Sequence, residues 1–110
     1  YPPAPPEQAN AYLEVLEAVT RLPAAIGLTA EQHRLGRSPA QSDISLENDI
    51  TVSRLHATVV LEGSDYRIYD ENSTAGTWVN EQRVPDYGQQ LMDGDEIRLG
   101  AARLRYRRLD

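Results

Sequence analysis

Three side chains that could do chemistry, Ser53, Arg54 and His56, lie within the stretch SRLHA, just before a run that alternates like a strand. A serine hydroxyl beside a histidine imidazole is the nucleophile and base pair of many hydrolases. Residues three apart on an extended segment, however, point to opposite faces. The G-x-S-x-G turn that presents a nucleophilic serine is also missing from the sequence. The pattern therefore gives little support to a hydrolase, and we expect no enzyme.

Metal and cofactor sites are equally poorly supported. The chain has 2 histidines and no cysteine. The segment Asp93-Gly94-Asp95 lacks the spaced ligands and closing glutamate of a calcium loop, and its composition is typical of a turn. Glycine-rich nucleotide-binding loops are absent as well. We expect no metal and no cofactor.

The residues that remain are those of an anion site made by loops. Arg37 follows Gly36, Ser53 and Arg54 precede a strand, and Ser73 and Thr74 lie in the loop-like segment DENSTAGT. A guanidinium group can hold two phosphate oxygens at once, and hydroxyl and backbone N–H groups can satisfy the others. The alternative for Arg37 is an ordinary surface salt bridge.

The elements that must position these residues are mostly short strands. Alternation and turn residues predict strands at 25–32, 43–46, 57–61, 66–69, 77–80, 96–99 and 103–107. Turns are expected at 63–65 and, as a hairpin, at 93–95. Residues 11–22 are ambiguous, because local spacing favours a helix while everything after them favours a sheet. Repeated short strands argue for an all-β sandwich.

Length and composition indicate the number of domains and limit the classes of partner. The 110 residues suit one domain, which we place at 11–110, behind a proline-rich linker or tail at 1–10. The net charge of −6 argues against nucleic acid, and the apolar runs are too short for membrane insertion. The lack of cysteine fits a cytoplasmic protein. The oligomeric state stays open.

Four motifs in order carry a resemblance to a known family. They are LGRSPAQSDISL with Gly36-Arg37, SRLHA, STAGTWVN at 73–80, and LMDGDEIRLG at 91–100. Together they resemble the forkhead-associated (FHA) domain. The resemblance implies a sandwich of two twisted antiparallel sheets of the FHA/SMAD type, with about eleven strands. It also makes residues 12–18 the first strand, against their local helical spacing.

The resemblance further implies a role for each site residue. The phosphate would be bound by Arg37, Ser53, Arg54 and Thr74. Ser73 and Ala75 would lie in the peptide groove. His56 would brace the binding loops without doing chemistry. The loops would also be supported by Gly36, Gly76, Thr77 and Asn80.

Ala75 departs from the family pattern, which has asparagine at this position. In the family that asparagine hydrogen-bonds the backbone of the bound peptide, and alanine cannot. The loss of one such bond costs about 1 kcal/mol, or roughly fivefold in affinity. We therefore expect binding that is weaker and more dominated by the phosphate.

The function implied is that of a non-catalytic module that binds phosphothreonine peptides and mediates phosphorylation-dependent protein–protein interaction. Its partner would be a protein phosphorylated by a Ser/Thr kinase. The alternative is a phospho-independent interaction or self-association domain that uses another face of the same sandwich.

Overall fold

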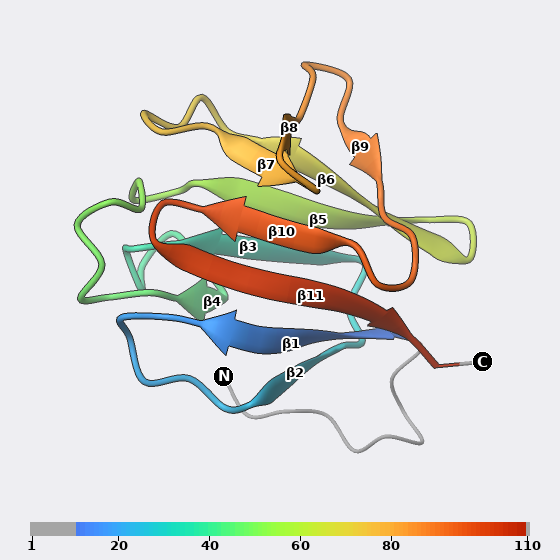
Figure 1. Cartoon of the computed structure of the whole chain (residues 1–110), viewed down its shortest axis with the longest axis horizontal. Coiled ribbons are helices and arrows are strands. Elements are labelled where there is room, and N and C mark those ends of the chain that lie inside the picture. Colours follow the sequence, from blue (N-terminus) through green and yellow to red (C-terminus); the bar gives the residue numbers. More distant parts are fainter. Residues whose placement is uncertain (1–10, 110) are drawn as a thin grey trace.

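The computed structural model describes residues 11–109 and shows two stacked β-sheets without a helix (Figure 1). The six-stranded sheet has the order β2-β1-β11-β10-β7-β8, and the five-stranded sheet the order β4-β3-β5-β6-β9. The expected all-β sandwich of about eleven strands is confirmed. The proposed tail at residues 1–10 lies outside the described residues.

The strands are short, as the turn-rich sequence predicts. In the six-stranded sheet they are β1 Ala11–Glu17, β2 Ala25–Leu28, β7 Thr77–Val79, β8 Gln82–Arg83, β10 Glu96–Leu99 and β11 Ala102–Arg108. In the five-stranded sheet they are β3 Gln32–Gly36, β4 Ile44–Ser45, β5 Ala57–Glu62, β6 Asp65–Asp70 and β9 Gln89–Gln90.

Within the ambiguous segment 11–22, residues Ala11–Glu17 form strand β1, and none of the segment is helical. Leu13 lies opposite Tyr106 of β11 and Ile26 of β2, so β1 is paired on both sides. Such pairing satisfies the backbone groups that a helix would satisfy internally, and it overrides the weak local preference. The segment 25–32 is a different case. We expected one strand there, and it contains β2 and the start of β3, which lie in different sheets.

The core lies between the sheets and is built by the alternating inward residues. Ile97, Leu99, Leu104 and Tyr106 of the six-stranded sheet are at most 1% exposed. They belong to one cluster with Leu35, Val59 and Ile68 of the other sheet. The outward residues between them are polar, as an antiparallel sheet with one solvated face requires.

Two details differ from the expected arrangement. The pair β3–β4 is parallel, with Leu35 opposite Ile44, so the sheets are not wholly antiparallel. The turn at 93–95 does not close a hairpin, because β9 before it pairs with β6 and β10 after it pairs with β7 and β11. This turn carries the chain from one sheet to the other.

Loops that matter for function gather at one end of the sandwich. In Figure 1 the green segment between β4 and β5 and the yellow segment between β6 and β7 both lie at the left end. The turn between β10 and β11 lies at the same end. The sequence positions identified as chemical thus converge, although they are far apart along the chain.

Candidate functional site

The end of β3 and the segment before β5 run side by side. The N–H of Arg37 donates to the carbonyl of Ser53 (2.9 Å), and that of Ser38 to the carbonyl of Arg54 (3.1 Å). The backbones are so close at Gly36 that a Cβ atom there would lie 2.1 Å from the carbonyl oxygen of Arg54. Only glycine fits this position, and its absent side chain allows Arg37 to lie beside Ser53 and Arg54.

The guanidinium group of Arg37 is held but not neutralised. Its Nε donates to the carbonyl oxygen of Val52 (3.0 Å), which leaves its terminal N–H groups for another acceptor. Every ion pair among residues 11–109 involves other arginines, so neither Arg37 nor Arg54 faces a carboxylate there. The surface salt bridge considered for Arg37 is thus not formed within this part of the chain.

The hydroxyl group of Ser53 is oriented by the loop that follows β6. The backbone N–H of Thr74 donates to Oγ of Ser53 over 3.1 Å. Because the oxygen already accepts this bond, the hydroxyl proton is left to donate to a further acceptor.

His56 joins the two loops from behind. It is fully buried, and its Nδ1 accepts the backbone N–H of Ser53 (3.0 Å). An N–H group can only donate, so the ring proton is on Nε2, which donates to the carbonyl of Gly76 (2.9 Å). The imidazole therefore contacts the backbone of Ser53 and not its hydroxyl, which is the arrangement of a brace rather than of a catalytic base.

The loop between β6 and β7 is organised by Asp70. Its Oδ1 accepts the hydroxyl groups of Thr77 (2.7 Å) and Ser73, and its Oδ2 accepts the N–H of Ser73 (3.2 Å). Oγ of Ser73 in turn accepts the N–H of Gly76 (2.9 Å). These bonds fix the backbone of 73–76, including the Thr74 N–H that meets Ser53.

The opposite side of the site is fixed by Thr51. Its Oγ1 donates to the buried carboxylate of Asp49 and accepts the N–H of Ala101 (2.8 Å). Gly100 lies against the same threonine, since a Cβ there would be 2.3 Å from Oγ1. The segment before β5 is therefore attached to the turn between β10 and β11.

These segments enclose a surface groove with a volume of about 610 Å³. The groove is lined by Arg37, Gln41, Ile50, Thr51, Val52, Ser53, Arg54, Leu55, Thr74 and Ala75. None of these side chains carries a negative charge, although the chain as a whole has a net charge of −6. The groove is therefore a local cationic site within an acidic molecule, and it would favour an anionic ligand.

The structure brings together five of the six residues predicted to touch the ligand. Arg37, Ser53, Arg54, Thr74 and Ala75 all line the groove. Ser73 does not, since it is 8% exposed and its hydroxyl is used within the loop. Leu55, which lies between Arg54 and His56 in the sequence, is half-buried and also lines the groove.

The residues predicted to support the loops fall into two groups. Gly36, His56, Gly76 and Thr77 make the close approaches and hydrogen bonds described above. Asn80 lies at the far end of β7, where its Nδ2 donates to Asp95 (2.8 Å) and its Oδ1 accepts the N–H of Glu96 (3.0 Å). Those contacts fix the turn that links the sheets and do not reach the groove.

Sequence reasoning missed the residues that act through the loops. It did not identify Asp70 and Thr51, which fix the loops, or Trp78 and Arg83, whose side chains lie beside Gly76. Asp70 could have been found, because an Asp followed three residues later by Ser is typical of a side chain that caps its own turn. The position of Arg83 beside the loop depends on the two-residue strand β8, which no local pattern predicts.

The described residues hold neither a metal-binding cluster nor a membrane-spanning helix. Among residues 11–109, no three histidine, aspartate or glutamate side chains are grouped so that they could hold a metal ion. The same part of the chain has no helix with the length and apolarity needed to cross a membrane.

Comparison with known proteins gives a consistent result. The family model described as "FHA domain" matches residues 33–100. The glycogen accumulation regulator GarA of Mycolicibacterium smegmatis is 46% identical over 69 residues, which are 63% of this chain and 41% of that protein. An oxoglutarate dehydrogenase inhibitor of Corynebacterium jeikeium is 44% identical over 77 residues, 70% of this chain and 51% of that protein. The chain thus spans about half or less of these relatives.

The solved structures agree with the sequence comparison. One comes from a structural and functional analysis of phosphothreonine-dependent FHA domain interactions. It superposes with a TM-score of 0.77 at 31% identity, covering 91% of this chain and 97% of its own.

Proposed function

Because this chain belongs to the FHA domain family, we propose that its groove binds a phosphothreonine peptide of a partner protein. FHA domains are non-catalytic binding modules, and the relatives above are named as a regulator and an inhibitor. One observation carries the proposal. The guanidinium groups of Arg37 and Arg54, neither facing a carboxylate among residues 11–109, line one groove with the Ser53 hydroxyl.

The three groups suit the oxygens of a phosphate. The terminal N–H groups of Arg37 would meet one or two oxygens, with the guanidinium plane set by its bond to Val52. The proton of Ser53 would go to another oxygen, since the serine oxygen is occupied by the N–H of Thr74. Arg54, which is exposed, would add charge at the rim.

The peptide beyond the phosphate would be held less firmly. Ala75 presents a methyl group to the groove, so the backbone of the peptide finds no side-chain amide there. Ile50 is 89% exposed at the other side of the groove and offers an apolar contact. The phosphate would therefore supply most of the affinity, as charge-assisted bonds are worth about 1.5–3 kcal/mol each.

The chemistry of the ligand indicates which class of partner the domain would meet. A phosphothreonine is made by a Ser/Thr kinase, so the partner would be a kinase substrate, met in the cytoplasm. The domain would comprise residues 11–110, with the proline-rich residues 1–10 as a linker or tail.

The test is calorimetric titration of the 110-residue chain with a peptide carrying phosphothreonine, phosphoserine or threonine at one position. We expect binding only to the phosphorylated peptides, and a loss of about tenfold or more in Arg37→Gln. Arg21→Gln is the matched control, because Arg21 is an exposed arginine outside the groove. Equal affinity for threonine and phosphothreonine, or an unchanged affinity of Arg37→Gln, would contradict the proposal.

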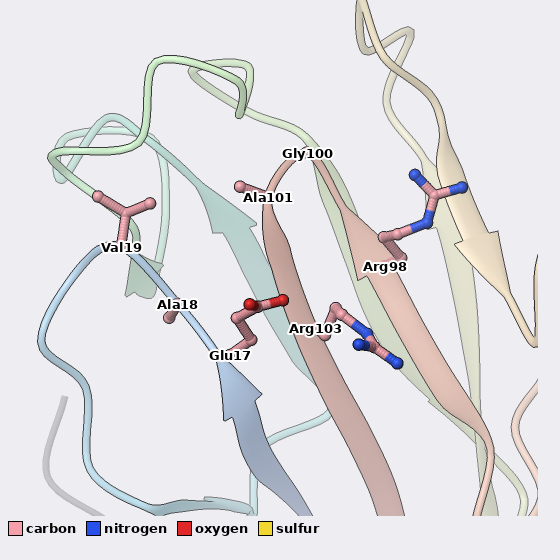
Figure 2. Close-up of a pocket in the computed structure, with 7 residues that line it drawn as sticks. All are labelled: Glu17, Ala18, Val19, Arg98, Gly100, Ala101 and Arg103. Carbon is pink, nitrogen blue, oxygen red and sulfur yellow. The ribbon is translucent and has the colours of Figure 1, made fainter.

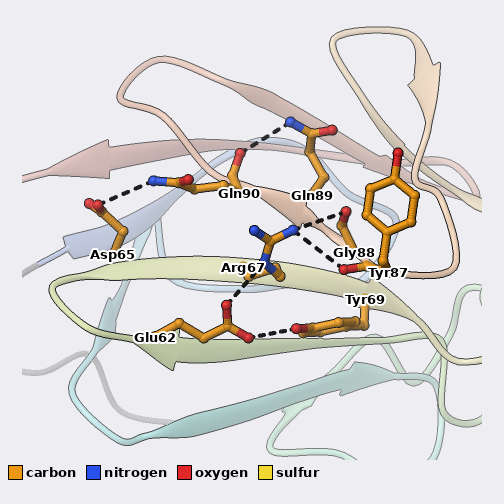
Figure 3. A network of polar contacts seen from close by, with 8 residues as sticks. All are labelled: Glu62, Asp65, Arg67, Tyr69, Tyr87, Gly88, Gln89 and Gln90. Carbon is orange, nitrogen blue, oxygen red and sulfur yellow. Dashed lines mark hydrogen bonds and ion pairs between the residues drawn. The ribbon is translucent and has the colours of Figure 1, made fainter.

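A second candidate function is a phospho-independent contact through the five-stranded sheet. There Arg67 donates from Nη1 to the carbonyls of Tyr87 (3.4 Å) and Gly88 (3.2 Å), and from Nε to Glu62 (3.0 Å) (Figure 3). Tyr69 donates to the same Glu62 (2.6 Å). The network fixes a loop on which Tyr87 is 77% exposed. Tyr87→Ala would weaken the binding of a partner that contacts this face, and it would leave phosphopeptide binding unchanged.

A further inference from the structure

We propose that Arg83, Trp78 and Arg98 form a second recognition surface, the arginine–tryptophan row, which binds acidic side chains on one flank of the phosphothreonine peptide. The inference rests on the proposed function of the groove and adds a preference that the groove residues do not supply. The ligand class is a peptide with carboxylates several residues away from the phosphothreonine.

The three side chains lie next to one another across neighbouring strands. Trp78 of β7 is paired with Arg83 of β8 on one side and with Arg98 of β10 on the other. Residues directly opposite in a sheet share a face, so all three point outward from the six-stranded sheet. The Cζ atom of Arg98 lies 5.0 Å from the centre of the Trp78 ring, as in a cation–π contact.

The row is continuous with the groove. Nε1 of Trp78 donates to the carbonyl of Ala75 (3.2 Å), and Ala75 lines the groove. A Cβ atom on Gly76 would lie 3.1 Å from Nε of Arg83 and 3.3 Å from Nε1 of Trp78. The guanidinium group of Arg83 is therefore beside the loop backbone, one residue beyond the groove lining.

The charges of the row are not neutralised within the described residues. On the same sheet face, Arg103 and Arg105 pair with Glu96, and Arg107 pairs with Glu14 and Asp93. None of the ion pairs among residues 11–109 involves Arg83 or Arg98. Arg98 points from β10 toward the neighbouring strand β7 and away from Glu17 (Figure 2). Two exposed arginines beside a tryptophan are suited to a carboxylate ligand.

Position then decides which part of the peptide can reach the row. Ile50 and Thr51 belong to one side of the groove and Thr74 and Ala75 to the other, and the row lies beyond Ala75. A peptide anchored by its phosphate can extend past Ala75 with one flank only. Acidic residues on that flank would meet Arg83 and Arg98, whereas acidic residues on the opposite flank would not. This contact would partly compensate for the hydrogen bond to the peptide backbone that Ala75 cannot make.

The experiment compares three phosphothreonine peptides that differ only in their flanks. One has alanine on both sides. The second has glutamate at the third to fifth positions before the phosphothreonine, and the third has glutamate at the third to fifth positions after it. Each is titrated by calorimetry into the unaltered chain, Arg83→Gln/Arg98→Gln and Arg21→Gln. Unphosphorylated forms of all three peptides are included.

We expect glutamate on one flank to raise the affinity about fivefold over the alanine peptide, and glutamate on the other flank to have little effect. The gain should disappear in Arg83→Gln/Arg98→Gln and persist in Arg21→Gln. The variant Arg21→Gln is the matched control, since it removes an exposed arginine from the segment between β1 and β2, at the opposite edge of the sheet.

The failures of the two proposals can be told apart. If the alanine peptide binds through its phosphate but glutamate on neither flank helps, the row is not a recognition surface and the groove proposal stands. An equal gain in affinity from glutamate on either flank would mean a general attraction to the cationic groove. A gain in affinity that persists in Arg83→Gln/Arg98→Gln would mean the same. Either result would overturn the proposal that the arginine–tryptophan row is a recognition surface. If no phosphorylated peptide binds better than its unphosphorylated form, both proposals fail.

Discussion

The backbone N–H of Thr74 donates to the hydroxyl oxygen of Ser53 across 3.1 Å, which joins two loops through residues that are 21 positions apart in the chain. The bond fixes the serine oxygen and directs its proton toward the groove. From it we predict that Ser53→Ala lowers phosphopeptide affinity about tenfold, since a hydrogen bond to a charged group is lost. Calorimetry measures the change. Ser64→Ala, in the exposed turn between β5 and β6, is the control and should bind normally.

Ala75 provides a test of the peptide grip. Ala75→Asn should raise the affinity for phosphothreonine peptides about fivefold, because an amide would then face the peptide backbone from the wall of the groove. Titration of the same peptide into both proteins measures the gain. A weaker affinity in the asparagine variant would contradict the prediction. It would show that the bound peptide follows a path that does not bring its backbone to residue 75.

Gly36 should be far more sensitive than another glycine in a turn. Gly36→Ala places a methyl group 2.1 Å from the carbonyl oxygen of Arg54, so the strands must separate and the free energy of unfolding should fall by about 3 kcal/mol or more. Gly63→Ala is the matched control, since a Cβ there meets nothing within 4 Å and only the φ of +70° is unfavourable. Its cost should be about 1 kcal/mol. Urea denaturation compares the two, and equal costs would contradict the close approach at Gly36.

Trp78 is the single tryptophan of the chain, and its indole is hydrogen-bonded to Ala75 at the wall of the groove. We predict that a phosphothreonine peptide changes the tryptophan emission, because a ligand beside Ala75 alters the surroundings of the indole. Fluorescence titration with excitation selective for tryptophan is the measurement. The spectrum should not respond to the unphosphorylated peptide at the same concentration.

His33 should make stability depend on pH. Burial lowers the pKa of its imidazole from the usual value of 6.5. The unfolded chain therefore binds a proton at a higher pH than the folded chain does. The free energy of unfolding should fall as the pH decreases from about 6.5 to the lowered pKa and should then become constant with respect to this group. Denaturant titrations between pH 7.5 and 5 test this, and His33→Gln should flatten the curve.

Much of the groove could be predicted because its residues follow motifs with fixed spacing. Gly36-Arg37, SRLHA and STAGT each keep their chemistry within a few residues, so the convergence of Arg37, Ser53 and Thr74 followed once the motifs were read together. The role of His56 as a brace was implied by the resemblance to the FHA family and not by spacing, and in the structure its two ring nitrogens are hydrogen-bonded to the backbone of Ser53 and Gly76.

Other features depend on pairings that leave no local signal. The strands β8 and β9 have two residues each and contain mainly glutamine, so neither alternation nor β-propensity marks them. The turn at 93–95 has the composition of a hairpin, but the partners of β9 and β10 lie in different sheets. Arg83 is near the groove only because β8 pairs with β7. Contacts of this kind are set by the tertiary structure.

The carboxylate of Asp70, which holds Ser73 and Thr77, also has a kinetic consequence. A loop already fixed by internal hydrogen bonds has little conformational entropy left to lose when a ligand arrives. Encounter with the phosphate would then require no slow rearrangement of the loop. Differences in affinity between peptides should accordingly lie in how fast they leave, so that residence time, rather than rate of capture, would distinguish one partner from another.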